Sequence, residues 1–269
     1  TSPGDTTYYI SYNSGNDNND GKSEDKAFKN LGKVNSITFK PGDKLMFKSG
    51  ETWKGYFKLR GSGSQDKPIV IESYSSGDKP KIDGNGYQAA VFIENQEYVN
   101  ISGLDLTNEA SHKNSNGSVK LMNQSSRSGE DERFGLLVLR HGSSNINDIK
   151  LDDIKISEIY PTPSNSDNNH QGYGIRFESL NDDSVLNYYD GIEIENLDIS
   201  NTGHYGIHIV NRMSGAQPDY YHRNIVIKDS KFNNTGGSGI VLARCKDVLV
   251  ENSEFKGSGS GNDNRMWNR

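Results

Sequence analysis

Hydrophobic and polar residues alternate through five short segments, and the alternation changes phase at the same place in each. The segments are YVNISGLDLTN, DIKLDDIKISE, GIEIENLDISN, NIVIKDSKFNN and DVLVENSEFKG. If the first apolar residue is position 1, positions 1, 3 and 8 are apolar in every copy, and position 5 is Gly, Asn or Asp. Period-two alternation predicts strands with one side facing a core. Gly, Asn and Asp tolerate left-handed backbone, so each copy predicts two strands joined by a bend.

A third alternating run lies between successive copies. The runs are FGLLVLRH (134–141), YGIRFES (173–179), YGIHIVN (205–211) and SGIVLAR (238–244), and AAVFIEN (89–95) precedes the first copy. A repeated unit of three short strands predicts a solenoid, and the lack of hairpin turns favours parallel pairing. The alignment predicts one buried ladder, made of Ile149, Ile192, Ile225 and Val248.

The two ends of the chain differ from the repeats. Residues 26–37 have apolar side chains at helical spacing, which predicts a short helix that caps the first coil. We expect a single domain, with the N-terminal strand, capping helix and first coil in 1–65 and further coils in 66–269. The C-terminal residues show no cap, so we expect an open last coil, a longer natural protein, and self-association through the open coil. The residues expected to be exposed there, or covered by a neighbouring chain, are Phe255, Met266 and Trp267.

Composition narrows the class of protein. Only 31% of residues are hydrophobic and 29 are glycine, but the apolar residues are periodic, which favours a narrow core over disorder. The net charge of −6, with both signs interspersed, argues against nucleic acid as a partner. The sequence contains no apolar run long enough to span a membrane, and the single cysteine, Cys245, cannot form an internal disulfide. The polar start TSPGDTT looks like a mature or trimmed N-terminus.

Several segments outside the repeats are typical of one family. They are YYIS…GNDNNDG…AFKNLGKVN, PGDKLMFKSGETW, GSGSQDKPIVIESY and PKIDG. With the repeats, they make essentially the whole chain similar to the right-handed β-helix repeat family of bacterial carbohydrate-active enzymes. The resemblance implies an all-β, single-stranded right-handed parallel β-helix of pectate-lyase type. It also implies a secreted, periplasmic or cell-surface location and a polysaccharide or oligosaccharide partner. Members include hydrolases, lyases and non-catalytic proteins, so the reaction stays open.

The third strands carry the candidate site. The alignment places two outward-facing columns on them, Val138–Arg176–His208–Val241 and Arg140–Glu178–Val210–Ala243. Phe134, Tyr173 and Tyr205 stack just before the glycines, and His204 lies beside them. Aromatic rings beside charged groups suit a sugar, although a solvated sheet face is the alternative. We predict Glu178, His208, Arg176 and Arg140 as catalytic residues, and Tyr173, Tyr205, His204 and Phe134 as substrate-binding residues.

The reaction depends on which groups complete this face. A glycosidase needs two carboxyl groups ~5–9.5 Å apart, and Glu178 is the only one in these columns. We expect Glu178 to stay ionised between Arg140 and Arg176. Loops at 107–133, 157–172 and 211–222 flank the face, and the loop candidates for a second carboxyl group are Asp167, Asp182, Asp183 and Asp219. Glycoside hydrolysis is favoured. The alternatives are a lyase acting on a uronate-containing glycan through Arg140, Arg176 and His208, and a non-catalytic glycan-binding protein.

Cofactor signals are weak. Asn16, Asn18 and Asp20 precede Gly21 with the spacing of a calcium loop, but Ala27 stands where that loop requires Glu. A plain Asn/Gly turn is the favoured interpretation, with calcium as the alternative. The Cys and His residues lack zinc-site spacing. We therefore expect no metal site and no other cofactor.

Overall fold

The computed structural model describes residues 1–110, 131–142, 146–161, 170–180, 188–211, 220–259 and residue 266. Strands in these ranges form three sheets, and all strand pairs within the sheets are parallel. The eight-stranded sheet contains β1 (Thr7–Ile10), β2 (Lys44–Lys48), β5 (Ile69–Tyr74), β8 (Val99–Ser102), β11 (Ile146–Asp152), β14 (Tyr189–Glu195), β17 (Arg223–Lys228) and β20 (Val248–Glu251). The seven-stranded sheet contains β3 (Thr52–Lys54), β6 (Lys81–Asp83), β9 (Asp105–Glu109), β12 (Lys155–Tyr160), β15 (Asp198–Thr202), β18 (Lys231–Thr235) and β21 (Glu254–Lys256). The six-stranded sheet contains β4 (Phe57–Leu59), β7 (Ala89–Glu94), β10 (Asp131–Arg140), β13 (His170–Ser179), β16 (Ile207–Asn211) and β19 (Ile240–Ala243).

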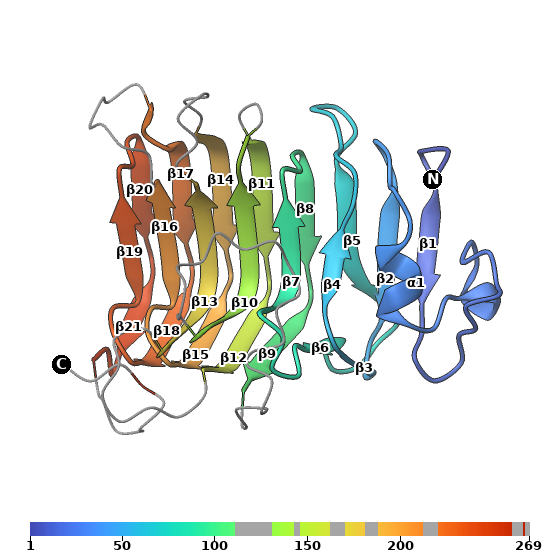
Figure 1. Cartoon of the computed structure of the whole chain (residues 1–269), viewed down its shortest axis with the longest axis horizontal. Helices are drawn as coiled ribbons and strands as arrows, with labels where there is room; N and C mark the ends of the chain where they lie inside the picture. Colours follow the sequence, from blue (N-terminus) through green and yellow to red (C-terminus); the bar gives the residue numbers. More distant parts are fainter. Residues whose placement is uncertain are drawn as a thin grey trace.

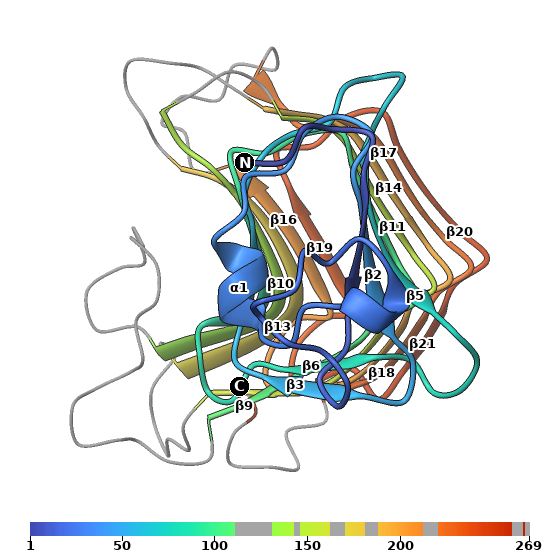
Figure 2. The same cartoon turned by 90° about the vertical axis from the view of Figure 1, so that its right-hand side faces the viewer.

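The chain visits the three sheets in turn and then repeats the circuit one strand further along. The strands therefore stack along the long axis (Figure 1), and the three sheets surround a common interior when viewed from the end (Figure 2). One hydrophobic core runs through this interior and takes side chains from every sheet, for example Ile149, Ile156 and Ile175. This arrangement is the all-β, parallel one that the repeats predict and fits a solenoid.

The predicted ladder is present in the eight-stranded sheet. Ile149 pairs with Ile192, Ile192 with Ile225, and Ile225 with Val248. The three isoleucines are at most 1% exposed, whereas Val248 is 37% exposed. The register is confirmed, but burial of Val248 is wrong, because β20 is the edge strand of the described sheet and only one neighbouring strand pairs with it.

The bends use left-handed backbone, as the residue types at position 5 predict. Gly103, Asp153, Asn196, Asp229 and Asn252 all have φ between 48° and 66°. The carboxamide of Asn196 donates a 2.8 Å hydrogen bond to the Asp152 carboxylate of the preceding coil. The bends therefore also link neighbouring coils through side chains.

Glycines stack in a column at the start of the third strands, where the alternation of inward and outward side chains shifts by one residue. A Cβ atom on Gly174 would lie 2.5 Å from the Gly206 carbonyl oxygen and 3.1 Å from Cγ2 of Ile199, a core residue. Gly135 and Gly206 face similarly close neighbours. Only glycine fits at these positions. The alternation shifts at the glycine, so the aromatic residue before it faces outward and the apolar residue after it faces the core.

The N-terminal helix is shorter than predicted. It consists of a 3-10 turn, η1 (Glu24–Lys26), and a single α-helical turn, α1 (Leu31–Asn35), which buries Leu31 and Val34. The Asn35 carboxamide lies against the edge strand β4. Its Nδ2 donates to the Tyr56 carbonyl at 2.9 Å, and its Oδ1 accepts the Lys58 N–H at 2.8 Å. One side chain therefore satisfies backbone groups that a neighbouring strand would otherwise pair.

The last described coil is more exposed than the coils inside. Phe255 is 45% exposed, whereas Phe232, its partner in the previous coil, is 1% exposed, as predicted. The prediction for Met266 is wrong, because this side chain is 5% exposed and lies beside Gly236. Trp267 lies outside the described residues. Within the described part of the chain, no helix is long and apolar enough to cross a membrane.

Candidate active site

The outer face of the six-stranded sheet brings most of the predicted site residues together. Arg176 pairs with Leu137 on one side and with His208 on the other, and Glu178 pairs with Leu139 and Val210. Arg176, Glu178 and His208 therefore share one face, as the third-strand alignment predicts. The loop predicted at 157–172 is shorter than expected, because β12 ends at Tyr160 and β13 begins at His170. The loop residues Asp167, Asp182, Asp183 and Asp219 lie outside the described residues.

Arg140 does not belong to this face. It pairs with Ser179 rather than Glu178 and is 0% exposed. The predicted register of β10 is wrong by one residue, because Leu136–Leu139 are all apolar and alternation gives no phase within them. Leu136 and Val138 face the core, in place of Leu137 and Leu139. The prediction that Arg140 and Arg176 flank Glu178 is wrong for the same reason.

Arg140 instead lies near Tyr189 and His222 at the opposite side of the strand. The Tyr189 hydroxyl donates to the carbonyls of Val138 and Glu178, at 2.9 and 2.7 Å. The Tyr189 N–H donates to Nδ1 of His222 at 3.0 Å. The net pKa of His222 is lowered to about 4, because burial and the positive charge of Arg140 outweigh the hydrogen bond to the Val210 backbone, which raises it. Arg140, Tyr189 and His222 are all buried inside the coil.

Arg176 is the centre of the outer cluster. Its Nη1 donates to Oε1 of Glu132 at 3.0 Å and to Oε2 of Glu178 at 3.5 Å, and its Nη2 lies 3.2 Å from Nδ1 of His208. A guanidinium group only donates hydrogen bonds, so Nδ1 of His208 accepts and the imidazole proton lies on Nε2. Burial lowers the pKa of Arg176, but the negative charges of Glu132 and Glu178 outweigh this, and the net pKa is raised.

Glu132 is a site residue that the sequence prediction missed. It lies at the start of β10, directly opposite Gln171 of β13. The predicted loop at 107–133 includes this position, so the predicted pairing of the third strands stops short of Glu132. The signal was nonetheless present, because DERFG and QGYG align on their aromatic-Gly pairs.

The aromatic residues stack as predicted but do not form an open platform. The Phe134 and Tyr173 rings are stacked at 5.5 Å, and Tyr205 meets Tyr173 edge-on at 5.7 Å. The Arg176 guanidinium lies 4.1 Å from the centroid of the Tyr173 ring. His204 is buried, with Nδ1 3.3 Å from the Tyr173 hydroxyl. Tyr205 is half-buried, whereas Phe134, Tyr173 and His204 are buried, so Tyr205 is the most accessible of these four side chains.

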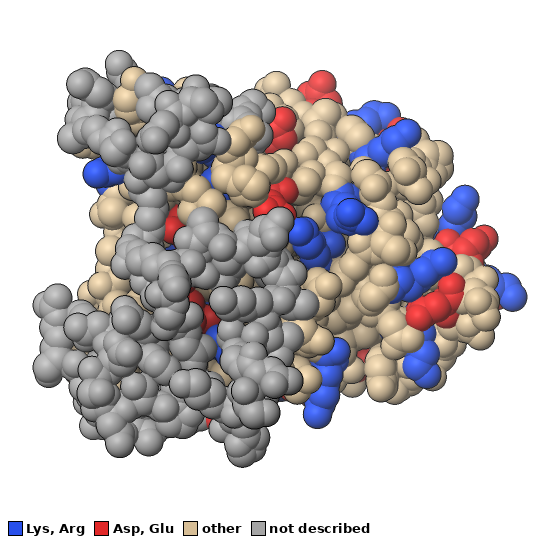
Figure 3. Space-filling model, viewed as in Figure 1, with Lys and Arg blue, Asp and Glu red and all other residues tan. Residues whose placement is uncertain are grey.

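Burial of the charged groups also differs from prediction. The side chains of Arg176, Glu132 and Glu178 are 2%, 5% and 12% exposed, whereas an exposed face was expected. The apolar residues Phe92, Leu137 and Leu139 pack beside the aromatic residues into a second hydrophobic cluster on this face. Figure 3 shows the side of the molecule on which acidic and basic side chains of the described residues are interspersed.

Two carboxyl groups and a half-buried histidine can support acid–base chemistry. Since both carboxylates contact the same Nη1 atom, their contacting oxygens lie no more than about 6.5 Å apart, which overlaps the separations found in glycosidases. The same three charges also form a structural ion-pair network, which perturbs pKa values without catalysis.

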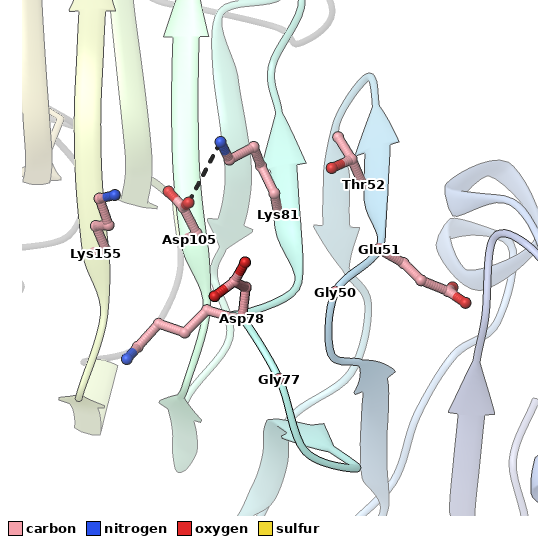
Figure 4. A pocket seen from close by; sticks show the side chains of 9 residues that line it. Gly50, Glu51, Thr52, Gly77, Asp78, Lys81, Asp105 and Lys155 are labelled. Carbon is pink, nitrogen blue, oxygen red and sulfur yellow. Dashed lines mark ion pairs between the residues drawn. The ribbon is translucent and has the colours of Figure 1, made fainter.

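A pocket of about 560 Å³ lies on a different sheet, at the N-terminal end of the seven-stranded sheet (Figure 4). It is lined by Gly50, Glu51, Thr52, Gly77, Asp78, Lys79, Lys81, Asp105 and Lys155. The lining is polar and carries both signs of charge. The sequence prediction did not include any of these residues.

The loop considered for calcium is held by its own hydrogen bonds. Oδ1 of Asn16 and of Asp20 each accept the backbone N–H two residues further on, at 3.0 Å. Asp17 accepts the N–H groups of Lys29 and Asn30. Burial raises the Asp17 pKa, but these hydrogen bonds outweigh it and the net pKa is lowered. The described residues contain no group of three or more Asp, Glu, His or Cys that could hold a metal ion. Burial raises the pKa of the Cys245 thiol to about 12, so this thiol is unreactive.

Comparison with known proteins shows similarity both in sequence and in structure. No family model matches the chain. It is 24% identical to a lacto-N-biosidase of Bifidobacterium longum subsp. longum over 94% of its own length and 20% of the relative. Two crystal structures of the GH136 lacto-N-biosidase from Eubacterium ramulus, a selenomethionine derivative and the native protein, superpose with TM-scores of 0.78 and 0.76 at 23% identity. The chain has their fold. The superpositions include 95% and 97% of this chain, but only 46% and 48% of the two lacto-N-biosidase chains.

Proposed function

We propose that this chain carries the active face of a glycoside hydrolase, with Glu132 and Glu178 as its two carboxyl groups. The observation that carries the proposal is their convergence on Arg176, at 3.0 and 3.5 Å, on the outer face of a fold shared with lacto-N-biosidases. The sequence similarity to a lacto-N-biosidase supports the same class of reaction. The chain spans 20% of that relative, so the assignment to this chain is our inference.

The geometry suggests different roles for the two carboxyl groups. Glu132 is more deeply buried and lies closer to Arg176, which holds it in a fixed position and suits a nucleophile or base. Glu178 is more exposed and has the longer contact with Arg176, which leaves it better placed to give a proton to a leaving-group oxygen. Nε2–H of His208 can donate to a sugar hydroxyl. The short separation of the carboxyl groups favours the retaining mechanism.

A lyase is disfavoured by the same arrangement. That interpretation required Arg140, Arg176 and His208 to neutralise a uronate together, but Arg140 lies inside the coil. Arg176 is bound to two carboxylates and is not available to a third. We therefore keep hydrolysis as the proposed reaction, on an oligosaccharide that contains a lacto-N-biose unit, as the name of the sequence relative suggests.

The test is a chromogenic assay with matched variants. The chain is incubated with p-nitrophenyl β-lacto-N-bioside and with a panel of other p-nitrophenyl glycosides, and p-nitrophenol release is followed. We expect Glu132→Gln and Glu178→Gln each to lower kcat by about 10²–10⁴-fold, the usual contribution of a general acid or base. Glu193→Gln is the control and is expected to keep full activity, because this side chain is exposed and belongs to the eight-stranded sheet. No release by the unaltered chain, or full activity in both glutamate variants, would refute the proposal.

Three further expectations belong with this function. We infer that the sheets close into a right-handed parallel β-helix, which the long-axis stacking and the shared core support. We infer that α1 caps its first coil, which the contacts of Asn35 with β4 support. We also propose secretion, which the resemblance to secreted carbohydrate-active enzymes supports.

A further inference from the structure

The pocket on the seven-stranded sheet is built by one column of side chains and one long turn. Thr52, Lys81, Asp105 and Lys155 occupy equivalent positions in four consecutive coils, since each pairs with the next. Neighbouring strands lie ~4.8 Å apart, so these side chains form a continuous row across the coils. The row alternates in charge from Lys81 to Asp105 to Lys155.

The turn that walls the pocket is specific to this coil. Two residues join the eight-stranded to the seven-stranded sheet in the later coils, for example between β8 and β9, whereas residues 75–80 join β5 to β6. Gly77 adopts φ of +126°, and the Asp78 carbonyl accepts the Gly50 N–H at 2.7 Å, which ties this turn to the preceding coil. Lys79 reaches across the Gly103 bend to Asp153, with an Nζ–Oδ1 distance of 3.0 Å. The extra residues thus enclose a space beside the charged row.

One buried acceptor in the pocket is unsatisfied. Asp105 is 8% exposed, its Oδ2 lies 3.5 Å from Nζ of Lys81, and its Oδ1 has no hydrogen-bond partner. Asp105 and Lys81 point toward each other and Asp78 lies next to them, while Glu51 points away (Figure 4). The Glu51 carboxylate accepts bonds from Ser11 and Tyr12 instead. Oδ1 is closed off from solvent, so a ligand in the pocket reaches this carboxylate through Oδ2, which can accept a hydrogen bond beside the contact with Lys81.

The charges on the lining select the class of ligand. Lys81 pairs with Asp105 and Lys79 with Asp153, which leaves the ammonium of Lys155 and the carboxylate of Asp78 without an ion-pair partner among the described residues. A neutral molecule with many hydroxyl groups matches this balance, because each hydroxyl both donates to carboxylates and accepts from ammonium groups. The volume is within the ~300–1,000 Å³ of small-molecule sites.

We propose that this pocket is a second glycan-binding site that takes a neutral saccharide, with Asp105 Oδ2 accepting a sugar hydroxyl and Lys155 donating to another. The site lies on a different sheet from Glu132 and Glu178, and it rests on the proposed function only in that both assign a glycan as ligand. It holds a saccharide chain without reacting with it.

The experiment is a titration of the ¹⁵N-labelled chain with maltotriose, cellotriose and chitotriose, followed through the amide signals of Gly50, Thr52 and Gly77. We expect saturable shifts of these signals with at least one trisaccharide. Asp105→Asn, which keeps the shape but removes the charge, is expected to weaken binding about tenfold, the usual loss for a charged hydrogen bond. Lys155→Gln is expected to weaken it less. Lys231→Gln, in the same column but outside the pocket, is the control and is expected to bind normally.

Several outcomes would overturn the site. They are the absence of shifts with all three sugars, unchanged binding in both Asp105→Asn and Lys155→Gln, and tighter binding of trigalacturonate than of the neutral sugars. Thermal unfolding of each variant verifies that it is folded. Glu132→Gln and Glu178→Gln are expected to keep the shifts. Lost hydrolysis with retained shifts therefore refutes only the proposed function, and retained hydrolysis without shifts refutes only this site.

Discussion

Arg176→Met tests whether the outer cluster is a buried charge network or a solvated surface. The side chain is 2% exposed and contacts two carboxylates, which are 5% and 12% exposed. Methionine keeps most of the volume over the Tyr173 ring but removes the charge that contacts both Glu132 and Glu178. Removal of one partner from a buried ion pair costs about 3–5 kcal/mol, against a total stability of about 5–15 kcal/mol. We expect a loss of this size.

The size of the loss can be measured directly. Urea unfolding of parent and variant at neutral pH, followed by circular dichroism, gives the two free energies of unfolding.

Two controls separate charge from packing. The triple variant Arg176→Met, Glu132→Gln, Glu178→Gln has no unpaired charge and should recover most of the loss, because a neutral replacement of a buried network is often tolerated. Lys150→Met breaks an exposed ion pair with Glu193, at 3.2 Å, and should cost less than about 1 kcal/mol. A loss below about 1 kcal/mol for Arg176→Met would refute the reasoning.

Three other substitutions test packing and titration within the coils. Gly174→Ala places a methyl group 2.5 Å from a carbonyl oxygen and should destabilise the fold by about 1–3 kcal/mol. Gly32→Ala, whose methyl group would have no atom within 4 Å, is the control and should not destabilise it. Equal urea midpoints for the two variants would contradict this prediction. The pKa of His222 is about 4 when folded and ~6.5 when unfolded, so stability should fall as pH drops from the unfolded towards the folded value. His222→Gln should flatten that part of the urea-midpoint profile, and an unchanged slope would count against it. Phe232→Ala should lower the free energy of unfolding by about 3–5 kcal/mol, and Phe255→Ala, at a 45% exposed side chain, by clearly less. Similar losses in thermal or urea unfolding would show that Phe255 is buried in solution.

The sequence by itself determined the repeat, the strands and the bends. Position 5 carries Gly, Asn or Asp in every copy, and all five of these residues adopt left-handed backbone. Period-two alternation also fixed which residues of β11, β14 and β17 face the core, because a polar residue separates most of the apolar ones and one register alone buries them. The stacking of Phe134 on Tyr173 followed from the same alignment.

Only the tertiary structure decided the composition of the two candidate sites. In Leu136–Leu139 every residue is apolar, so alternation carries no phase there. The aromatic-Gly pairs align β10 with β13 in the observed register, but the burial of Arg140 and Arg176 follows only from the packing of the coils. Glu132 became visible once β10 was seen to begin at Asp131. The pocket at Asp105 depends on how the turn at 75–80 packs over two neighbouring coils, and local sequence does not specify contacts between turns that are separated by whole coils. Alternation specifies which way a side chain points within one strand, whereas a site requires the spacing and packing of several strands, which exist only after the coils have stacked.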